Sequence, residues 1–186
     1  GGQWSTSAAF FDYDKDGYLD LYISNYISFD LKNLPRRGSN KYCNYRGIPV
    51  MCGPRGLNGA PDVLYHNNGD GTFSERGLQA GVAYNGDGSA LSYMGADFRD
   101  VDNDGRPDIF VTAISNETFS YFHNEGGGIF DDFTYRSGLG RLSIFASGWS
   151  NGIFDLNNDG RKDLFSANSH VNDNIGFEMN VPFKQR

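Results

Sequence analysis

The sequence has little glutamate and no long run of apolar residues. Of its 23 acidic residues, 19 are aspartate and only 4 are glutamate. Solvation alone would use glutamate as freely as aspartate, so we infer a specific use of the short carboxylate. No stretch approaches the roughly 18 apolar residues that suggest a membrane span, and we expect no membrane insertion. The formal net charge of −7 argues against a nucleic-acid partner.

Cysteine is also scarce, because only Cys43 and Cys52 are present. Both lie in a segment that is rich in glycine, proline and arginine and shows no strand or helix period. A disulfide that closes this loop is the favoured interpretation. The alternative is two reduced thiols packed in a loop. A zinc site would need more ligands than these two cysteines and one histidine.

What the sequence contains in abundance is a repeated acidic motif. It occurs in three segments that align without gaps, residues 11–23, 99–111 and 154–166, and these segments hold 11 of the aspartates. We number the motif from its first aspartate, which is Asp12, Asp100 or Asp155. Each copy then has carboxylate or amide side chains at positions 1, 3 and 5, glycine at position 6 and aspartate at position 9, with apolar residues after it. Three such copies favour a metal loop over a solvated acidic turn that binds nothing.

The spacing of this motif predicts calcium. Ca²⁺ takes six to eight oxygen ligands, whereas Mg²⁺ keeps more of its water. An EF-hand is not expected, because its loop has twelve residues and flanking helices. The neutral Asn157 predicts that the third site is the weakest. We predict about three Ca²⁺ ions per chain, bound by side chains and by the carbonyls of Tyr18, Arg106 and Arg161. The side-chain ligands are Asp12, Asp14, Asp16 and Asp20, then Asp100, Asp102, Asp104 and Asp108, then Asp155, Asn157, Asp159 and Asp163.

A second motif sets the repeat length. Residues 64–73 resemble residues 121–130, and 55 residues separate the second and third acidic motifs. The first unit carries an extra segment, about 30–60, which reads as a surface insertion closed by the cysteines. Short apolar runs between glycine turns, including the Asn-Gly-Asp-Gly turn at 68–71, predict hairpins. The equivalent turn in the second copy is Glu-Gly-Gly-Gly and is expected to differ.

These features predict an all-β fold made of about three four-stranded β-propeller blades. A propeller typically needs four or more blades, so we expect an incomplete propeller and a segment of a longer protein. The predicted organisation is a single repeat domain over residues 1–186, with units at about 1–82, 83–139 and 140–186. Exposed sheet edges would then favour self-association.

The acidic hairpins resemble FG-GAP or VCBS repeats, as in integrin-α-type propellers. The segments 47–57, 59–65 and 67–73, together with Gly148-Trp149, are similar to the ASPIC/UnbV and cartilage-acidic-protein-like group. This resemblance implies a secreted, extracellular or periplasmic seven-bladed propeller with calcium in its blade loops. It also implies adhesion or partner binding rather than catalysis, with an unknown protein or glycan as ligand.

An enzymatic function is not expected. His66 and His123 occupy equivalent repeat positions and are interpreted as structural, and His170 stands alone. No nucleophile elbow or phosphate-binding loop is present. The alternatives are a carbohydrate-binding module, in which Trp4 and Trp149 stack on sugar rings, and a calcium-dependent polysaccharide-processing enzyme. Both tryptophans precede apolar strands, and a position in the core is favoured for them.

Overall fold

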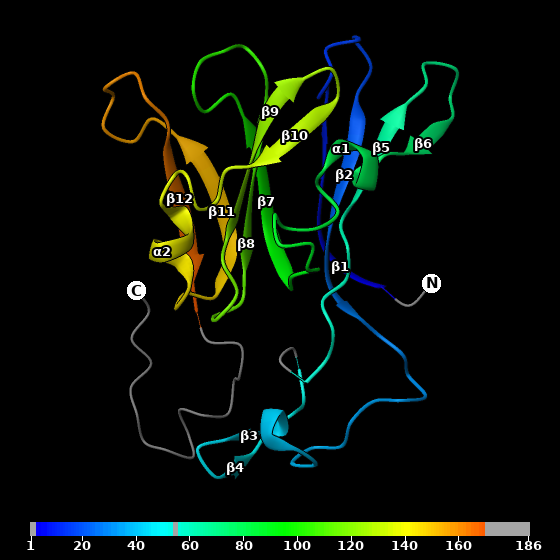
Figure 1. Ribbon diagram of the computed structural model, residues 1–186, viewed down its shortest axis with the longest axis vertical. Helices are drawn as coiled ribbons and strands as arrows, with labels where there is room; N and C mark the ends of the chain where they lie inside the picture. Colours follow the sequence, from blue (N-terminus) through cyan, green and yellow to red (C-terminus); the bar gives the residue numbers. More distant parts are fainter. Residues whose placement is uncertain (1–2, 54–55, 170–186) are drawn as a thin grey trace.

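The computed structural model describes residues 3–53 and 56–169. Within this part of the chain, most of the regular structure is β, arranged as two four-stranded and two two-stranded antiparallel sheets (Figure 1). The predicted all-β fold of incomplete, propeller-like blades is confirmed, and the described residues close no barrel. The last part of the third predicted blade, and with it His170, lies outside the described residues.

The first sheet has the strand order β1-β2-β5-β6. Its strands are β1 (Gln3–Phe11), β2 (Asp20–Ser28), β5 (Val63–Asn67) and β6 (Phe73–Glu75), and the helix α1 (Gly77–Ala80) follows. The segment between β2 and β5 holds the 3-10 helix η1 (Lys41–Cys43) and the short strands β3 (Asn44–Tyr45) and β4 (Ile48–Pro49).

The second sheet repeats this order, and a hairpin follows it. The strands of the second sheet are β7 (Tyr93–Arg99), β8 (Asp108–Ala113), β9 (Ser120–Gly126) and β10 (Ile129–Asp132). After the helix α2 (Leu139–Ser143), β11 (Gly148–Phe154) pairs with β12 (Asp163–Asn168). No helix in the described ranges has the length and apolar character needed to cross a membrane.

The first strands of the three sheets lie side by side, with β7 between β1 and β11 (Figure 1). Side chains link them: the Thr6 hydroxyl donates to the Tyr93 carbonyl at 2.9 Å, and the Asn151 amide donates to the Gly95 carbonyl at 3.2 Å. A Cβ on Gly95 would lie 3.0 Å from the Trp149 carbonyl oxygen. Glycine at this position therefore permits the close approach of β7 and β11.

Apolar side chains fill the space between the sheets. The rings of Phe11 and Phe98 stack with centroids 4.1 Å apart, and Tyr22 meets Phe98 edge-on at 5.4 Å. All six residues of β8 are buried, because the middle sheet has a neighbour on each face. The stacked sheets thus share one continuous core, as neighbouring propeller blades do.

The two tryptophans do not lie in this core, so the prediction that they do is wrong. Trp4 is 52% exposed and Trp149 is 49% exposed. Each lies on a strand that borders the core, and the Trp4 ring packs edge-on against Phe29 at 5.3 Å. Both tryptophans are therefore about half exposed at the border of the core.

The two second-motif hairpins turn differently, as their sequences predict. β5 and β6 are joined by five residues, in which Gly69 and Gly71 have φ of 74° and 86°. β9 and β10 are joined by only two residues, Gly127 and Gly128, with φ of 63° and 78°. Two consecutive positive φ angles are typical of a type I′ turn, which glycine favours.

The insertion of about residues 30–60 is closed as expected. A disulfide joins Cys43 to Cys52, and both cysteines are buried. Backbone hydrogen bonds support the closure, among them Val50 N–H to the Cys43 carbonyl at 2.9 Å. The predicted disulfide is confirmed.

A buried polar cluster lies where the insertion returns to the sheet. Asp62 accepts hydrogen bonds from the Tyr22 hydroxyl and, at 2.7 Å, from the Asn25 backbone N–H. The Asn25 amide donates to the Pro61 carbonyl at 2.7 Å. Burial raises the pKa of the Asp62 carboxyl well above its ordinary value, and the two hydrogen bonds offset only part of this rise.

Candidate metal centres

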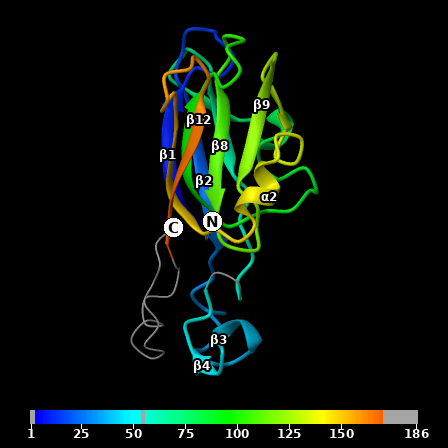
Figure 2. The same cartoon turned by 90° about the vertical axis from the view of Figure 1, so that its left-hand side faces the viewer.

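The three acidic loops lie at one end of the molecule (Figures 1 and 2). They connect β1 to β2, β7 to β8 and β11 to β12, so each loop joins the first two strands of a sheet. The aspartate at position 9 is in each case the first residue of the second strand. The strand pairing therefore fixes both ends of every loop.

The backbone of the loop is the same in all three copies. At position 4, φ is 62° for Lys15, 65° for Asn103 and 59° for Asn158, which is the left-handed region that non-glycine residues seldom adopt. The glycine at position 6 has φ of 92°, 90° and 86° in the three loops. The shared conformation shows that the motif specifies one turn.

Backbone N–H groups hold the loop carboxylates in place. In the second loop, Asp100 accepts from Asp104 N–H at 3.0 Å and from Gly105 N–H at 2.8 Å. Asp102 accepts from Asp104 N–H at 3.2 Å, and Asp104 accepts from Arg106 N–H at 2.7 Å. The equivalent bonds occur in the first and third loops. At positions 3 and 5 of the first two loops these bonds use Oδ1 and leave the second carboxylate oxygen for another partner.

The aspartate at position 9 ties its loop to the third strand of the sheet. Asp20 accepts from Tyr13 N–H at 3.2 Å and from Asn67 N–H at 2.8 Å. Asp108 accepts in the same way from Val101 N–H at 3.0 Å and from Asn124 N–H at 2.9 Å. Both carboxylates are buried.

Burial also affects how these two carboxyls ionise. It raises the pKa of Asp20 and of Asp108, and the backbone hydrogen bonds counter part of the rise. A cation in the loop would favour the ionised form of both groups.

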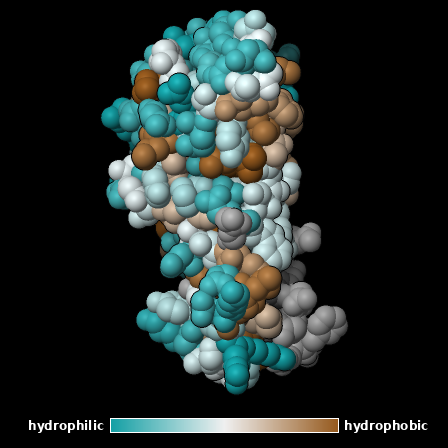
Figure 3. Space-filling model, turned by 90° about the vertical axis from the view of Figure 1, so that its right-hand side faces the viewer, coloured by the Kyte–Doolittle hydropathy of each residue, from teal (hydrophilic) through white to brown (hydrophobic). Residues whose placement is uncertain are grey.

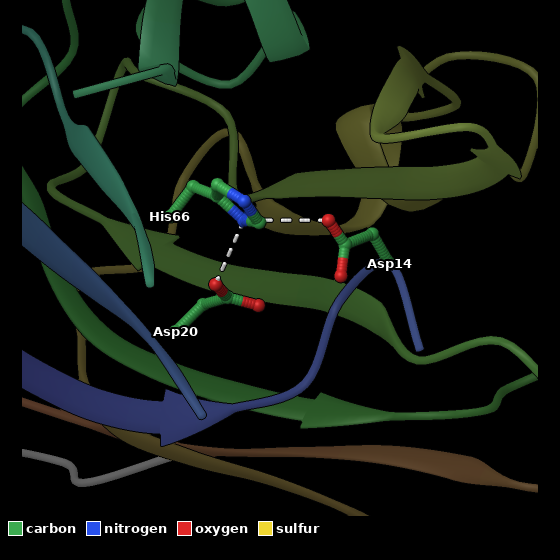
Figure 4. A group of neighbouring side chains, drawn as sticks. All are labelled: Asp14, Asp20 and His66. Carbon is green, nitrogen blue, oxygen red and sulfur yellow. Dashed lines mark ion pairs between the residues drawn. The ribbon is translucent and has the colours of Figure 1, made fainter. Parts of the chain in front are cut away.

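Two histidines from the third strands lie beside the carboxylates of the first two loops. In the first, His66 Nδ1 lies 3.3 Å from Asp14 Oδ2 and 3.2 Å from Asp20 Oδ1 (Figure 4). This buried nitrogen makes no hydrogen bond within the described part of the chain. In the second, His123 Nε2 lies 3.0 Å from Asp102 Oδ2.

The surroundings of His123 favour its charged form. Burial acts to lower the pKa of the imidazole, but hydrogen bonds to Glu125 and Asp102 together with nearby carboxylates raise it overall. Glu125 Oε1 lies 3.0 Å from His123 Nδ1. Without a metal ion, a protonated imidazole would partly balance the carboxylates of the second loop.

The sequence predicts a structural role for both histidines and does not place them beside the loop carboxylates. The signal in the sequence was that both histidines occupy equivalent positions in the repeat. Each lies on a strand that pairs with the strand after the acidic loop, β5 with β2 and β9 with β8. The register places Leu21 opposite Tyr65, so the next pair along the strands brings His66 beside Asp20. The contact depends on strand pairing across the insertion, which the loop motif alone does not reveal.

The donor atoms of the first two loops fit a divalent cation. In each of four groups, one ligand atom per residue lies within 4.8 Å of the others. Oxygens around a Ca²⁺ ion lie 2.3–2.6 Å from it, so opposite ligands are about 5 Å apart. The groups are Asp12, Asp14 and Asp16; Asp14, Asp20 and His66; Asp100, Asp102 and Asp108; and Asp102, Asp104 and His123.

The second and third loops differ from the first. In the second, the Arg106 guanidinium forms an ion pair with Asp104 Oδ2. A cation that binds there must compete with this arginine. In the third, Asn157 replaces a carboxylate, and its amide donates to Asp159 Oδ2 at 3.0 Å. Among the described residues, the third loop forms no group of three charged or imidazole ligands.

Stacked antiparallel sheets with one acidic loop each define a class of propeller-like repeat proteins. The model of the FG-GAP-like repeat family matches residues 52–111 and 100–166, which together are more than half of the chain. The chain therefore belongs to the FG-GAP-like repeat family, and this part of the predicted resemblance is confirmed. No curated protein matches the sequence.

Proposed function

We propose that this chain is a calcium-stabilised scaffold for extracellular interactions, with one Ca²⁺ in each acidic loop. The observation that carries the proposal is the threefold recurrence of one loop conformation with one set of backbone-to-carboxylate hydrogen bonds. Such a loop presents preoriented oxygens, which a hard cation requires. The side-chain oxygens at positions 1, 3, 5 and 9, all carboxylates except the Asn157 amide, and the carbonyls of Tyr18, Arg106 and Arg161 would supply the ligands.

Calcium would act on the hairpins themselves. Four carboxylates in one loop repel each other, and a bound cation removes this repulsion. Because each loop joins two paired strands, binding would be coupled to the order of the hairpin. The third site would be the weakest, since Asn157 lowers its charge.

The disulfide and the family support a place outside the cytoplasm. Disulfides persist in oxidising compartments, and Cys43 and Cys52 are joined. FG-GAP-like repeats build interaction scaffolds, so partner binding rather than catalysis is the proposed role. Membership of the ASPIC/UnbV group, and adhesion as the biological outcome, are part of this proposal.

Calorimetry and metal analysis test the calcium sites. We expect elemental analysis to find about three Ca²⁺ ions per chain, and EDTA to lower the melting temperature with recovery by Ca²⁺ more than by Mg²⁺. Asp104→Ala should lose one ion. The matched control is Asp87→Ala, because Asp87 is exposed and lies outside the loops. Calcium-supplied protein whose melting temperature EDTA leaves unchanged, or metal-free protein that added Ca²⁺ does not stabilise, would refute the proposal.

A further inference from the structure

The insertion has a charge opposite to that of the rest of the molecule. Between Asp30 and Asp62 the chain holds six of its 16 basic residues and none of its 23 acidic residues. The net charge of the whole chain is −7, so the remainder carries −13 and this segment carries +6. We name the described residues of this segment, 31–53 and 56–60, the basic insertion.

The basic insertion lies at the end of the molecule opposite the acidic loops (Figures 1 and 2). Figure 3 shows hydrophilic surface over this end, with hydrophobic atoms beside it. Among the described residues, no ion pair involves Lys32, Arg36, Lys41 or Arg46. The basic side chains that the structure describes are all exposed, namely Lys32, Arg36, Arg37, Lys41 and Arg46. This end therefore presents a positive surface to solvent.

Aromatic rings lie among these charges. Lys41 Nζ lies 4.7 Å from the centroid of the Tyr42 ring, and Arg46 Cζ lies 5.6 Å from that of Tyr45. Tyr42 is 50% exposed, so one part of its ring is open to a ligand. A cation beside an exposed ring suits a ligand that offers both an anionic group and a flat apolar face.

The surface is held by cross-links within the insertion. The disulfide Cys43–Cys52 closes it, and Arg37 Nε donates to the Pro49 carbonyl at 2.7 Å. At its base, Ser28 N–H donates to the Asn58 carbonyl at 2.9 Å. A braced surface loses less conformational entropy on binding than a flexible loop does.

We propose that the basic insertion binds an acidic polysaccharide, with anionic groups on its basic side chains and a sugar ring against Tyr42. This rests on the proposed function, because it names the partner class of the scaffold. The Asp and Glu side chains of an acidic polypeptide carry their charge on a short flexible chain and offer no ring beside it. A second copy of this chain is also a weaker candidate partner, because calcium bound in its acidic loops would neutralise most of their charge.

Binding of the calcium-loaded protein to immobilised dextran sulfate tests the proposal. Uncharged dextran, which has the same sugar backbone without the sulfate groups, is the control. We expect binding to dextran sulfate alone, with an affinity that falls as salt rises. The triple variant Lys32→Gln, Arg36→Gln, Arg46→Gln should weaken binding about tenfold, since it removes three exposed charges from the surface that meets the polyanion. The control triple Arg76→Gln, Arg136→Gln, Arg141→Gln removes the same charge elsewhere and should stay within about twofold of the original chain.

A fourth variant and a second polyanion separate glycan from protein partners. Tyr42→Ala should weaken dextran sulfate binding severalfold without changing its salt dependence, because it removes a ring and no charge. Equal binding of polyglutamate and dextran sulfate, with Tyr42→Ala inert, would overturn the proposal in favour of an acidic protein. Equal losses in both triple variants, or no binding to dextran sulfate, would also overturn it. Calcium content measured on the same samples tests the loops separately.

Discussion

Replacing Asp108 by alanine should destabilise the protein even when no calcium is present. Its carboxylate accepts from Val101 N–H at 3.0 Å, from Asn124 N–H at 2.9 Å and from the Tyr121 hydroxyl at 3.2 Å. These bonds join the loop to the third strand independently of any ion. Asp102, in contrast, is exposed, and its Oδ2 contacts only His123 among the described residues.

The magnitude follows from the donors that lose their acceptor. A buried donor left without a partner costs about 1–3 kcal/mol, and Asp108 serves two backbone N–H groups and one hydroxyl. The desolvation that raises the pKa of Asp108 offsets part of this loss. We expect a net loss of about 3 kcal/mol, which corresponds to a fall of about 6–12 °C in melting temperature for a chain of this size. Asp102→Ala should cost less than about 1 kcal/mol in EDTA, because the two contacts it removes, with His123 and with Asp104 N–H, are exposed to solvent.

Thermal unfolding of both variants, in EDTA and in excess calcium, measures the difference. In calcium, both variants should melt below the original chain, since each lacks a ligand of the second site. In EDTA, Asp108→Ala should melt well below the original chain and Asp102→Ala close to it. If Asp108→Ala does not fold, Asp108→Asn keeps one acceptor oxygen and should show a smaller loss of the same kind. Equal melting temperatures of Asp102→Ala and either Asp108 variant in EDTA would refute the reasoning.

Two further predictions concern charge. Asn157→Asp should tighten the weakest calcium site about tenfold by adding a carboxylate, with no change in stoichiometry by titration calorimetry; an unchanged affinity would contradict it. Asp62→Asn keeps one acceptor oxygen for the Asn25 N–H and an amide group that can donate to the Tyr22 hydroxyl oxygen, but it removes a buried charge. Because the folded pKa of Asp62 is raised, its stabilising contribution is complete below the unfolded pKa and is lost as pH rises. Above pH ~4, the free energy of unfolding of the variant should therefore exceed that of the original chain by up to about 1.4 kcal/mol more for each pH unit, until the pH passes the folded pKa of Asp62. Denaturant unfolding of both proteins at pH 5 and pH 8 measures this difference. A difference in stability between variant and original chain that does not change with pH would count against the prediction.

The acidic loops were predictable because their information is local. Carboxylates, glycine and spacing all lie within nine residues, and the structure gives each loop the same conformation. The contact of His66 with Asp20 was not predictable, since it depends on the pairing of β2 with β5, which the insertion separates in the sequence. The buried cluster around Asp62 has no periodic signal. Trp149 was misplaced because an apolar strand in a stack of sheets has two faces, and sequence alternation does not say which face is covered.

The repeats and the insertion divide the molecule into two kinds of surface. The loops recur with every sheet, so their chemistry belongs to the architecture and would hold each hairpin in the same way. The basic insertion occurs once, carries its own disulfide and lies far from the loops (Figure 1). A segment that is not needed to repeat the sheet, and that reverses the charge of the chain, is better explained by recognition than by stability. Partner choice should therefore depend on the basic insertion, while calcium should set how firmly the sheets beneath it are held.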